Sequence, residues 1–254
     1  MRPPRAPPTL PAEATLTAAA LEILGLTRRY RGGRTALDRV DLSLARGRTL
    51  GLAGPNGSGK STLLSIVAGT EVATSGSVRV LGGSPLDRAV LRRVGWLPED
   101  SPFPRELSAR AALELCGALQ GLTRAQLGER CGPMLETVGL GPHARTRLGR
   151  YSRGMLRRFG LAQAVLHDPE LLLLDEPTAG LDAQGFEALD LLLDRARARG
   201  ASVVLASHLA GDLERRCDEL CVLVDGRVAA RGAPAEVLGR SSLLEIYRAG
   251  ARTR

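Results

Sequence analysis

Residues 54–62 read Gly-Pro-Asn-Gly-Ser-Gly-Lys-Ser-Thr, and this glycine-rich stretch constrains the fold more than any other part of the sequence. It has the spacing G-x-x-x-x-G-K-S/T, with an apolar run at residues 50–53 before it and a helical pattern at residues 61–67 after it. Glycines let the backbone curl with its N–H groups turned inward, and the positive end of the following helix faces the same point. The stretch therefore predicts a strand, loop and helix that bind the phosphates of a nucleoside triphosphate.

The use of basic residues supports this interpretation of the loop. The chain has 35 lysine and arginine residues, and Lys60 of the loop is the only lysine among them. The lysine ammonium is a compact point charge, whereas the arginine guanidinium is a planar fork. The one lysine thus stands where a compact cation has to fit among phosphate oxygens, which favours a functional loop.

Bulk properties indicate a soluble globular protein of 254 residues, because 44% hydrophobic residues suffice for a packed core. No window contains the run of about 18 apolar residues that a membrane-spanning helix needs. Residues 1–20 are rich in proline and alanine and lack the apolar block of a signal peptide, so we expect a disordered leader on a cytoplasmic protein. The four cysteines lack C-x-x-C spacing and are expected to be reduced core residues.

The formal net charge of +8 raises the question of a nucleic-acid or anionic membrane partner. The arginines, however, are scattered along the chain rather than massed in one segment. Solvated helix faces are the expected explanation for most of the short clusters, which lie at residues 28–31, 157–158 and 195–199. We therefore expect no nucleic-acid partner.

Short strands are predicted on both sides of the loop. Alternating hydrophobicity at residues 21–26 and 40–44 predicts half-buried antiparallel strands, and residues 76–82 predict a third. Tyr30 lies in the arginine-rich connection between the first two and is one of only seven aromatic residues (three tyrosines, three phenylalanines and one tryptophan). Stacking on an adenine ring would explain an aromatic side chain there. A partly exposed structural tyrosine is the alternative.

The sequence pattern changes from strand-like to helical after a predicted strand at residues 94–99. Helix signals dominate from about residue 100 to residue 149, including a capping box at residues 123–126, and we expect a helical subdomain at about 100–159 inserted into an α/β core. Ser152 is placed to cap a helix that runs to about His167. A helix N-terminus that carries a serine and a glycine can hold an anion, although many helices begin with serine.

Two buried strands in the last third of the chain end in polar residues. The apolar run at 171–174 is typical of a parallel strand buried on both faces, and it ends in Asp175 and Glu176. A second such strand at 203–206 is followed by His208, and residues 221–230 predict a hairpin. Ligands bind at the carboxyl ends of strands in open α/β sheets, so these polar residues are candidates for a site.

Taken together, these motifs resemble those of the ATP-binding cassette (ABC) family of transport ATPases. The resemblance covers residues 21–244 and rests on the phosphate loop, the Tyr-Ser-Arg-Gly-Met stretch at 151–155, the Asp175 and Glu176 pair, the loop at 179–182 and His208, in the family's order and spacing. It implies one ATPase domain over residues 21–254. Its fold would be α/β: a P-loop NTPase core with a mostly parallel sheet, an N-terminal antiparallel β-subdomain and the inserted helical subdomain.

The resemblance also implies a role for each candidate residue. The loop and Lys60 would hold the β- and γ-phosphates of ATP, while Ser61 and Asp175 would serve a Mg²⁺ ion. Glu176 would polarise the attacking water, and His208 would contact the γ-phosphate. Asp182 would link the two sites of a homodimer, in which Ser152 and Gly154 serve the nucleotide of the opposite subunit. The implied nucleotide-binding residues are Tyr30, Gly54, Pro55, Asn56, Gly57, Ser58, Gly59, Lys60, Ser61, Thr62, Glu99, Ser152, Gly154 and Asp182.

Three positions depart from the family's commonest pattern. Glu99 stands where many relatives carry glutamine, so that a carboxylate would make the contact to Mg²⁺. Arg153 and Met155 stand where glycine and glutamine are commonest. Similar residues mark the branch that powers exporters of drugs, polysaccharides and lipids through a separate six-helix permease. The resemblance therefore implies an ATP-hydrolysing subunit held by its permease at the cytoplasmic face of the cell membrane.

Alternatives from other classes stay open at this point. DNA-associated relatives would use the basic charge to bind DNA. They place a long coiled coil or a zinc insert between the phosphate loop and the stretch that corresponds to residues 151–155, whereas this chain has about a hundred residues without heptads there. Translation-factor relatives carry two cassettes in one chain. A cassette that binds ATP only to dimerise or regulate is favoured by the departures at Glu99 and Arg153, and it is opposed by the intact catalytic set.

Overall fold

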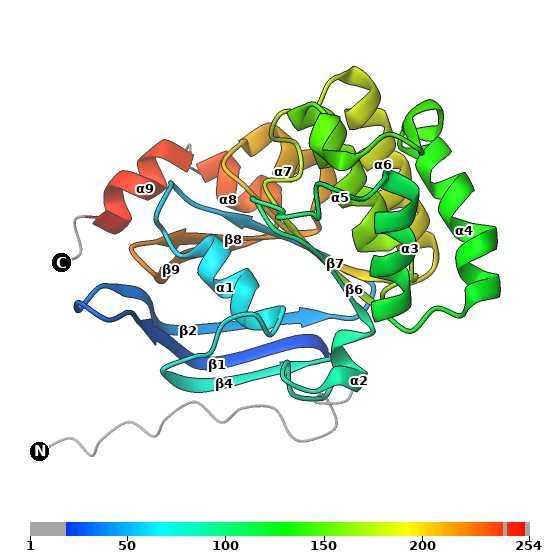
Figure 1. Ribbon diagram of the computed structural model, residues 1–254. Helices are drawn as coiled ribbons and strands as arrows, with labels where there is room; N and C mark the ends of the chain where they lie inside the picture. The colour runs from blue at the N-terminus through cyan, green and yellow to red at the C-terminus, as the bar shows by residue number, and fades with distance from the viewer. Residues whose placement is uncertain (1–18, 241–242, 252–254) are drawn as a thin grey trace, which may run out of the picture.

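The computed structural model describes residues 19–240 and 243–251, which fold into a mixed α/β protein (Figure 1). Its strands form two sheets with helix α1 (Lys60–Val67) between them. Side chains of α1 such as Leu63 and Leu64 are fully buried in one hydrophobic cluster with residues from both sheets. The predicted fold class, with a mostly parallel sheet and an antiparallel one, is confirmed.

The smaller sheet is antiparallel and has the order β2–β1–β4. Its strands are β1 (Ala19–Arg29), β2 (Thr35–Ala45) and β4 (Ser75–Val80), so the three strands predicted in this part of the chain are confirmed. The alternation of polar and apolar residues in β2 places Val40, Leu42 and Leu44 in the core. Because β1 begins at residue 19, the leader expected at residues 1–20 overlaps the strand by two residues, and the rest of that leader lies outside the described residues.

The larger sheet has the order β5–β6–β7–β3–β8–β9. Neighbouring strands run parallel except for β8 and β9, which form the predicted hairpin and turn at Asp225 and Gly226, both at positive φ. Every residue of β3, β6 and β7 is buried, which explains their continuous apolar runs. The strands are β3 (Thr49–Ala53), β5 (Val94–Leu97), β6 (Leu171–Asp175), β7 (Ser202–Ser207), β8 (Glu219–Val224) and β9 (Arg227–Gly232).

The chain between β5 and β6 is mainly helical and forms one end of the molecule in Figure 1. Thr123 and Gln126 make the predicted capping box at the start of α4. Phe159 of α5 is fully buried and meets Phe103 edge-on, with ring centroids 4.8 Å apart. The elements here are α3 (Ala109–Leu119), α4 (Arg124–Thr137), the short 3-10 helices η2 (Gly141–His143) and η3 (Leu148–Arg150), and α5 (Arg153–Val165).

Five further helices complete the described part of the chain. They are α2 (Arg88–Leu91), α6 (Ala183–Ala198), α7 (Ala210–Arg216), α8 (Pro234–Arg240) and α9 (Leu243–Ala251). None of the helices in the described part of the chain has the length and hydropathy required to cross a membrane. All four cysteines are free, and burial raises the pKa of Cys217 and Cys221 to about 12, so both stay protonated thiols at neutral pH.

Candidate nucleotide-binding site

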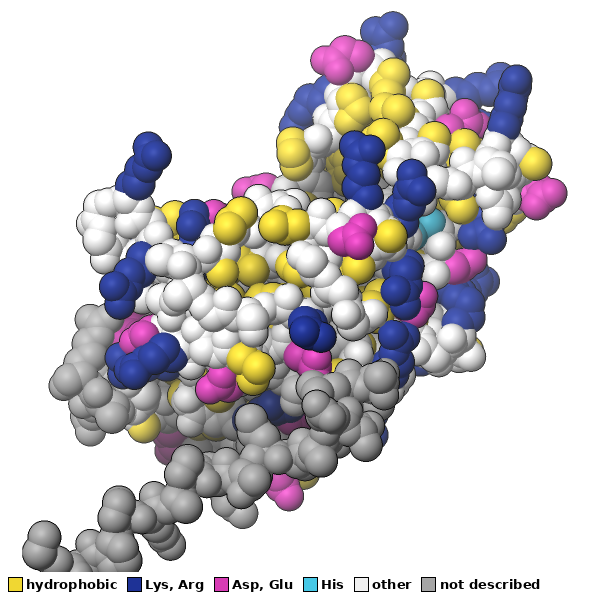
Figure 2. All heavy atoms as spheres, turned by 90° about the horizontal axis from the view of Figure 1, so that it is seen from below, with side chains coloured by type: hydrophobic (Ala, Val, Ile, Leu, Met, Phe, Trp, Pro, Cys, Tyr) yellow, Lys and Arg dark blue, Asp and Glu magenta, His cyan; other side chains and the backbone are white. Residues whose placement is uncertain are grey.

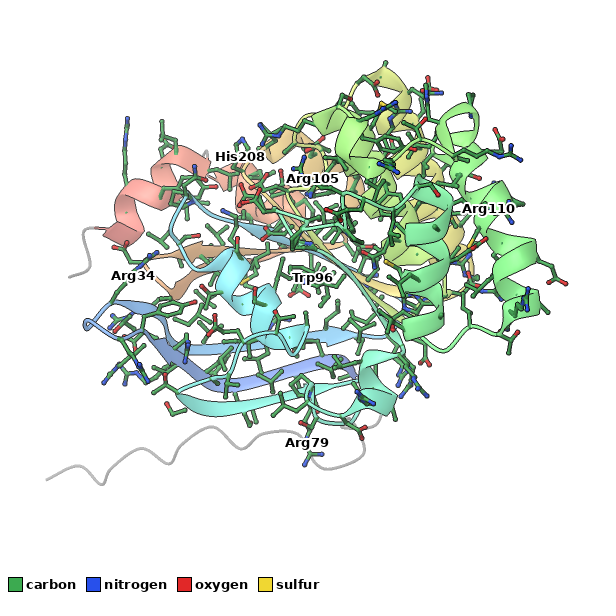
Figure 3. The ribbon with its side chains drawn as sticks, in the orientation of Figure 1. Arg34, Arg79, Trp96, Arg105, Arg110 and His208 are labelled. Atoms are coloured by element: carbon green, nitrogen blue, oxygen red, sulfur yellow. The ribbon has the colours of Figure 1, made fainter. Side chains whose placement is uncertain are left out.

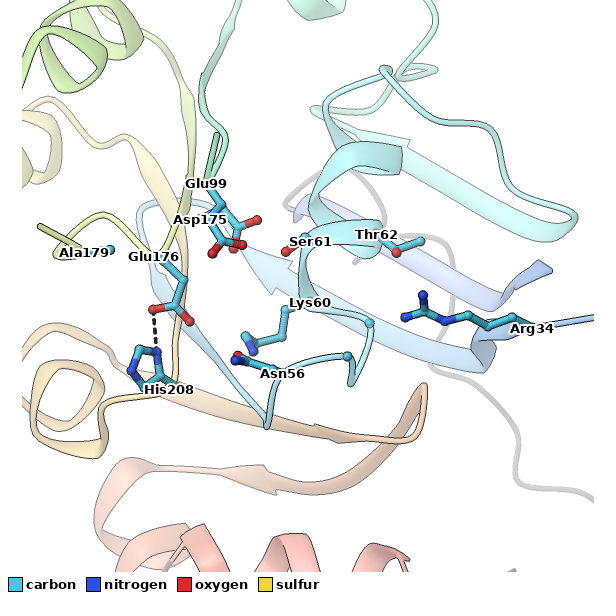
Figure 4. A pocket seen from close by; sticks show the side chains of 12 residues that line it. Arg34, Asn56, Lys60, Ser61, Thr62, Glu99, Asp175, Glu176, Ala179 and His208 are labelled. Atoms are coloured by element: carbon cyan, nitrogen blue, oxygen red, sulfur yellow. Dashed lines mark hydrogen bonds and ion pairs between the residues drawn. The ribbon is translucent and has the colours of Figure 1, made fainter. Parts of the chain in front are cut away.

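A pocket of about 440 Å³ opens at the carboxyl ends of parallel strands β3, β5, β6 and β7 (Figure 4). Its volume and its position at this edge suit a ligand site in an α/β fold. The pocket brings together most of the residues that the sequence singled out, although they come from widely separated segments. Its lining residues are Arg34, Asn56, Gly57, Gly59, Lys60, Ser61, Thr62, Glu99, Asp175, Glu176, Ala179 and His208.

The phosphate loop has the predicted form, with β3 ending at residue 53 and α1 beginning at residue 60. Two of its glycines are required by close backbone contacts. A Cβ on Gly54 would lie 2.5 Å from the carbonyl oxygen of Leu223, and one on Gly59 would lie 2.5 Å from that of Ala36. The N-terminus of α1 has no side-chain cap, so its N–H groups can receive an anion.

Lys60 is buried within the loop that it follows. Its Nζ donates to the carbonyl oxygens of Gly54 at 2.7 Å and Pro55 at 3.3 Å, which curls the loop around the ammonium. Burial lowers the pKa of this lysine, while the nearby carboxylates of Glu176 and Asp175 oppose that shift. An ammonium has three donors, so the third remains for a phosphate oxygen.

The residues expected to serve a Mg²⁺ ion fit one. Asp175 is buried at the end of β6, and its Oδ1 has no hydrogen-bond partner within the described residues. Burial raises the pKa of this carboxyl group, and a hydrogen bond from the Ser61 hydroxyl opposes the shift. Glu99 lies beside Asp175 and faces the same space (Figure 4). Carboxylate and hydroxyl oxygens are the ligands that Mg²⁺ prefers, and an orphaned carboxylate oxygen is a place for the ion or its water shell.

Glu176 lines the pocket beside His208. Its carboxylate Oε2 lies 2.9 Å from His208 Nδ1, and the side chain of His208 is 54% exposed whereas that of Glu176 is 8% exposed (Figure 4). The exposed histidine thus contacts the buried carboxylate and fixes its orientation. A carboxylate held in this way next to a phosphate loop can accept a proton from water.

Tyr30 does not line the pocket. Its hydroxyl donates to Glu71 at 3.1 Å and lies 3.3 Å from the hydroxyl oxygen of Thr62, so the ring is tied to helix α1. The guanidinium of Arg28 lies over the ring, 4.7 Å from its centroid. One ring face is thereby occupied, and the stacking of adenine on Tyr30 stays a prediction.

Six other predicted residues lie outside the pocket lining: Gly54, Pro55 and Ser58 belong to the phosphate loop itself, and Ser152, Gly154 and Asp182 lie at the starts of helices α5 and α6. The Ser152 hydroxyl accepts from the N–H of Met155 at the start of α5, and Asp182 caps α6 by accepting from the N–H of Gly185. A Cβ on Gly154 would lie 3.0 Å from the carbonyl oxygen of Gly180. The start of α5 therefore touches the loop before α6, whose Ala179 lines the pocket although Ser152, Gly154 and Asp182 do not.

The structure also reveals site residues that the sequence analysis missed. Arg34, between β1 and β2, lines the pocket and points toward the phosphate loop (Figure 4). Tyr247 of α9 is not among the lining residues, but its buried hydroxyl lies next to the backbone of Gly54 at the start of the phosphate loop. Neither residue belongs to a motif, because each reaches the site from a segment that only the fold brings near.

The expectation that solvated helix faces explain the arginine clusters is wrong for Arg157 and Arg158. Each is only 7% exposed, because α5 packs between the larger sheet and the other helices. Arg79, Arg105 and Arg110 project from separate elements in Figure 3. The face shown in Figure 2 carries basic side chains interspersed with acidic ones.

The fold and the site together define a P-loop nucleotide-binding protein in which loop, acidic pair and histidine meet at one sheet edge. Residues 37–179 match the model of the ABC transporter family. An uncharacterized ABC transporter ATP-binding protein of Bacillus subtilis is 38% identical over 218 residues, which cover 85% of this chain and 72% of the relative. The chain belongs to the ABC transporter family, as one of its ATP-binding subunits.

Other comparisons agree with this assignment. The Nod factor export ATP-binding protein I of Paraburkholderia xenovorans is 36% identical over 238 residues, which cover 90% of this chain and 77% of the relative. A solved ATP-binding subunit of an ABC transporter is 28% identical, with a TM-score of 0.83 over 92% of this chain and 100% of that chain. A dimeric cassette bound to ADP and phosphate is 24% identical with a TM-score of 0.78, which shows the same fold.

Proposed function

We propose that this protein hydrolyses ATP as the subunit that powers a membrane transporter, with residues 21–254 acting as one ATPase domain. The observation that carries the proposal is the pocket in which Lys60, Asp175, Glu176 and His208 converge on the phosphate loop. A cassette that only bound ATP would need the loop, but it would not need a buried carboxylate held by a histidine. The intact catalytic set therefore favours hydrolysis over purely regulatory binding.

The proposed mechanism assigns the binding of ATP to the loop and the chemistry to β6 and β7. The loop N–H groups and Lys60 bind the β- and γ-phosphates, and Ser61 and Asp175 would hold Mg²⁺, which neutralises phosphate charge when bound. Glu176 accepts a proton from the attacking water, while His208 keeps the carboxylate directed toward the pocket. Arg34 adds a further cation at the exposed rim.

We further propose that two copies of the chain complete each other's sites. Ser152 and Gly154 lie at the start of α5 and do not line the pocket of their own chain. A helix N-terminus with an exposed serine suits the phosphate of a nucleotide held by a second subunit. Asp182, in the loop that touches this helix start, would lie between the two sites. The dimeric cassette with the same fold supports dimerisation.

The proposed partner is a separate integral-membrane permease, and export is the favoured direction. Relatives named as Nod factor export proteins support export, as do the Glu99, Arg153 and Met155 departures. The helical segment at about residues 100–159 would receive the permease, which would hold this subunit at the cytoplasmic face of the cell membrane.

The test is co-expression with the product of a neighbouring reading frame, chosen because it encodes about six hydrophobic helices. We expect the two proteins to purify together, and vesicles that contain both to hydrolyse ATP only in the presence of Mg²⁺. ATP binding without turnover at any protein concentration would favour the regulatory alternative. Turnover without association with the permease would retain the ATPase and remove the transporter assignment.

Glu99 gives a sharper prediction about coupling. It lies two residues after the end of β5, between the pocket and the helical segment, and its carboxylate faces Asp175. If Glu99 contacts the Mg²⁺ shell only when ATP is bound, the difference can supply a coupling free energy of about 1–3 kcal/mol between nucleotide and permease. Glu99→Ala should therefore reduce transport more than basal ATPase activity in reconstituted vesicles. An equal loss of ATPase in the isolated dimer would make Glu99 an ordinary ligand, and unchanged transport would remove it from the mechanism.

A further inference from the structure

Arg157 of helix α5 is buried against the ends of the two strands that carry the acidic residues of the site. Its Nη1 donates to the carbonyl oxygens of Pro98 at 2.6 Å and Glu99 at 3.0 Å, just after β5. Its Nη2 donates to the carbonyl oxygens of Asp175 and, at 2.7 Å, of Glu176, at the end of β6. One planar guanidinium thus ties both strand ends to a helix that contributes no side chain to the pocket.

These hydrogen bonds all go to backbone carbonyls, which distinguishes Arg157 from an arginine in an ion pair. Because the guanidinium holds the main chain, it leaves the carboxylates of Glu99 and Glu176 free to face the pocket. Burial lowers the pKa of Arg157, and the field of Asp175, Glu99 and Glu176 opposes that shift and keeps the cation in place. Arginine suits this position, because its rigid fork presents several donors in one plane.

The backbone of Glu176 explains why such a restraint is needed. Its φ of 48° lies in the left-handed region, which residues with a side chain rarely adopt. Its N–H donates to the carbonyl oxygen of Ala206 at 2.9 Å, and its own carbonyl accepts from Arg157. An unfavourable backbone conformation persists only where the surroundings over-determine it. The Glu176 carbonyl also accepts from the N–H of Ala179 at 3.0 Å, so Arg157 is one of three hydrogen-bond partners that hold the main chain of Glu176 in the conformation that directs its carboxylate.

Helix α5 connects this restraint to the surface. Arg157 lies five residues after the capping Ser152, which is about 7.5 Å along the helix axis. A continuous α-helix over that length moves as one body, so a displacement of its N-terminus reaches the guanidinium with little loss. Glu99 and Glu176 would then follow through the carbonyls to which Arg157 is bound.

We propose that Arg157 is a positioning residue that sets the catalytic carboxylate of its own site according to the placement of helix α5. The inference rests on the proposed function, in which Ser152 and Gly154 meet the nucleotide of a second subunit. When the second subunit binds its nucleotide, that nucleotide contacts the start of α5 and fixes the position of the helix. Arg157 transmits this position to Glu176. Arg157 contacts no substrate, and it acts only through the backbone that it holds.

The first test is steady-state ATP hydrolysis by the full-length Arg157→Gln variant. We expect kcat to fall about 10- to 100-fold, as for other residues that orient catalytic groups, while KM for ATP changes less than about threefold. Arg216→Gln is the matched control, because Arg216 is as deeply buried and pairs with Asp190 and Asp212 outside the pocket. Thermal unfolding of both variants shows whether a similar loss of stability leaves kcat unchanged in the control.

A double-mutant cycle with Glu176→Gln separates positioning from general loss of structure. If Arg157 acts through Glu176, Arg157→Gln should cause little further loss in single-turnover hydrolysis once the carboxylate is gone. Losses that multiply would overturn the proposal, and so would an unchanged kcat in Arg157→Gln. If that variant does not fold, Arg157→Lys replaces it. The lysine keeps the charge without the planar fork, so a wild-type kcat in Arg157→Lys would also overturn the proposal.

The same measurements keep this inference distinct from the proposed function. A wild-type protein that binds ATP without hydrolysing it would contradict the proposed function before Arg157 is changed. A wild-type protein that hydrolyses ATP, together with an Arg157→Gln variant that keeps its kcat, would contradict the role of Arg157 alone.

Discussion

Replacing Glu176 by glutamine is expected to slow ATP hydrolysis by ~10²- to 10⁴-fold, the range that positioned general bases contribute. Glutamine has nearly the same shape but cannot take a proton from the attacking water. The phosphate loop is unchanged in this variant, so ATP should bind as in the wild type. The bound nucleotide then persists, and the variant should accumulate as an ATP-bound dimer.

The measurement combines turnover with size-exclusion chromatography in ATP with and without Mg²⁺. Glu187→Gln is the matched control, since Glu187 is an exposed glutamate on α6 outside the pocket and should leave turnover unchanged. A Glu176→Gln variant that hydrolyses ATP at the wild-type rate would place the base elsewhere. Glu99 is then the next candidate, because its carboxylate lines the same pocket.

Lys60→Arg is expected to weaken ATP binding by ~10- to 100-fold, although the positive charge is kept. Hydrogen bonds to charged groups are worth about 1.5–3 kcal/mol, and the exchange misplaces those that the ammonium makes. The ammonium is buried where the loop closes on it, 2.7 Å from the carbonyl oxygen of Gly54. A planar guanidinium is larger and cannot occupy that space without opening the loop.

Equilibrium ATP binding and turnover of Lys60→Arg check this expectation. Arg79→Lys makes the reverse exchange at an exposed position of β4 and should change neither quantity. Wild-type binding and turnover in Lys60→Arg would show that any cation suffices at this position. The single lysine of the chain would then reflect composition rather than chemistry.

Several features of the fold followed from local patterns in the sequence. The alternation at residues 40–44, the apolar run at 171–174 and the hairpin pattern at 221–230 each predicted the element that the structure contains. Such features are decided by side-chain period and by backbone conformational preference, both of which act over a few residues. The capping box at Thr123 was predictable for the same reason.

Other features depended on contacts between distant segments. Arg157 and Arg158 were expected at a solvated face because two adjacent arginines in a helix usually lie in water. The partners that bury Arg157 are backbone carbonyls of two strands, 58 and 19 residues away in the chain for Glu99 and Glu176. Carbonyl groups carry no sequence signal, so no pattern in the residues could have identified them.

By itself, the sequence determined the phosphate loop, the pair Asp175 and Glu176, and the position of His208, because loop geometry and strand ends require those residue types in that order. Only the tertiary structure decided how these residues are directed: the left-handed backbone of Glu176, its contact with His208 and the arginine that holds its carbonyl. The reason is physical. Residue type sets which chemistry is possible, whereas the direction of a side chain depends on packing and hydrogen bonds from elements that are distant in the chain.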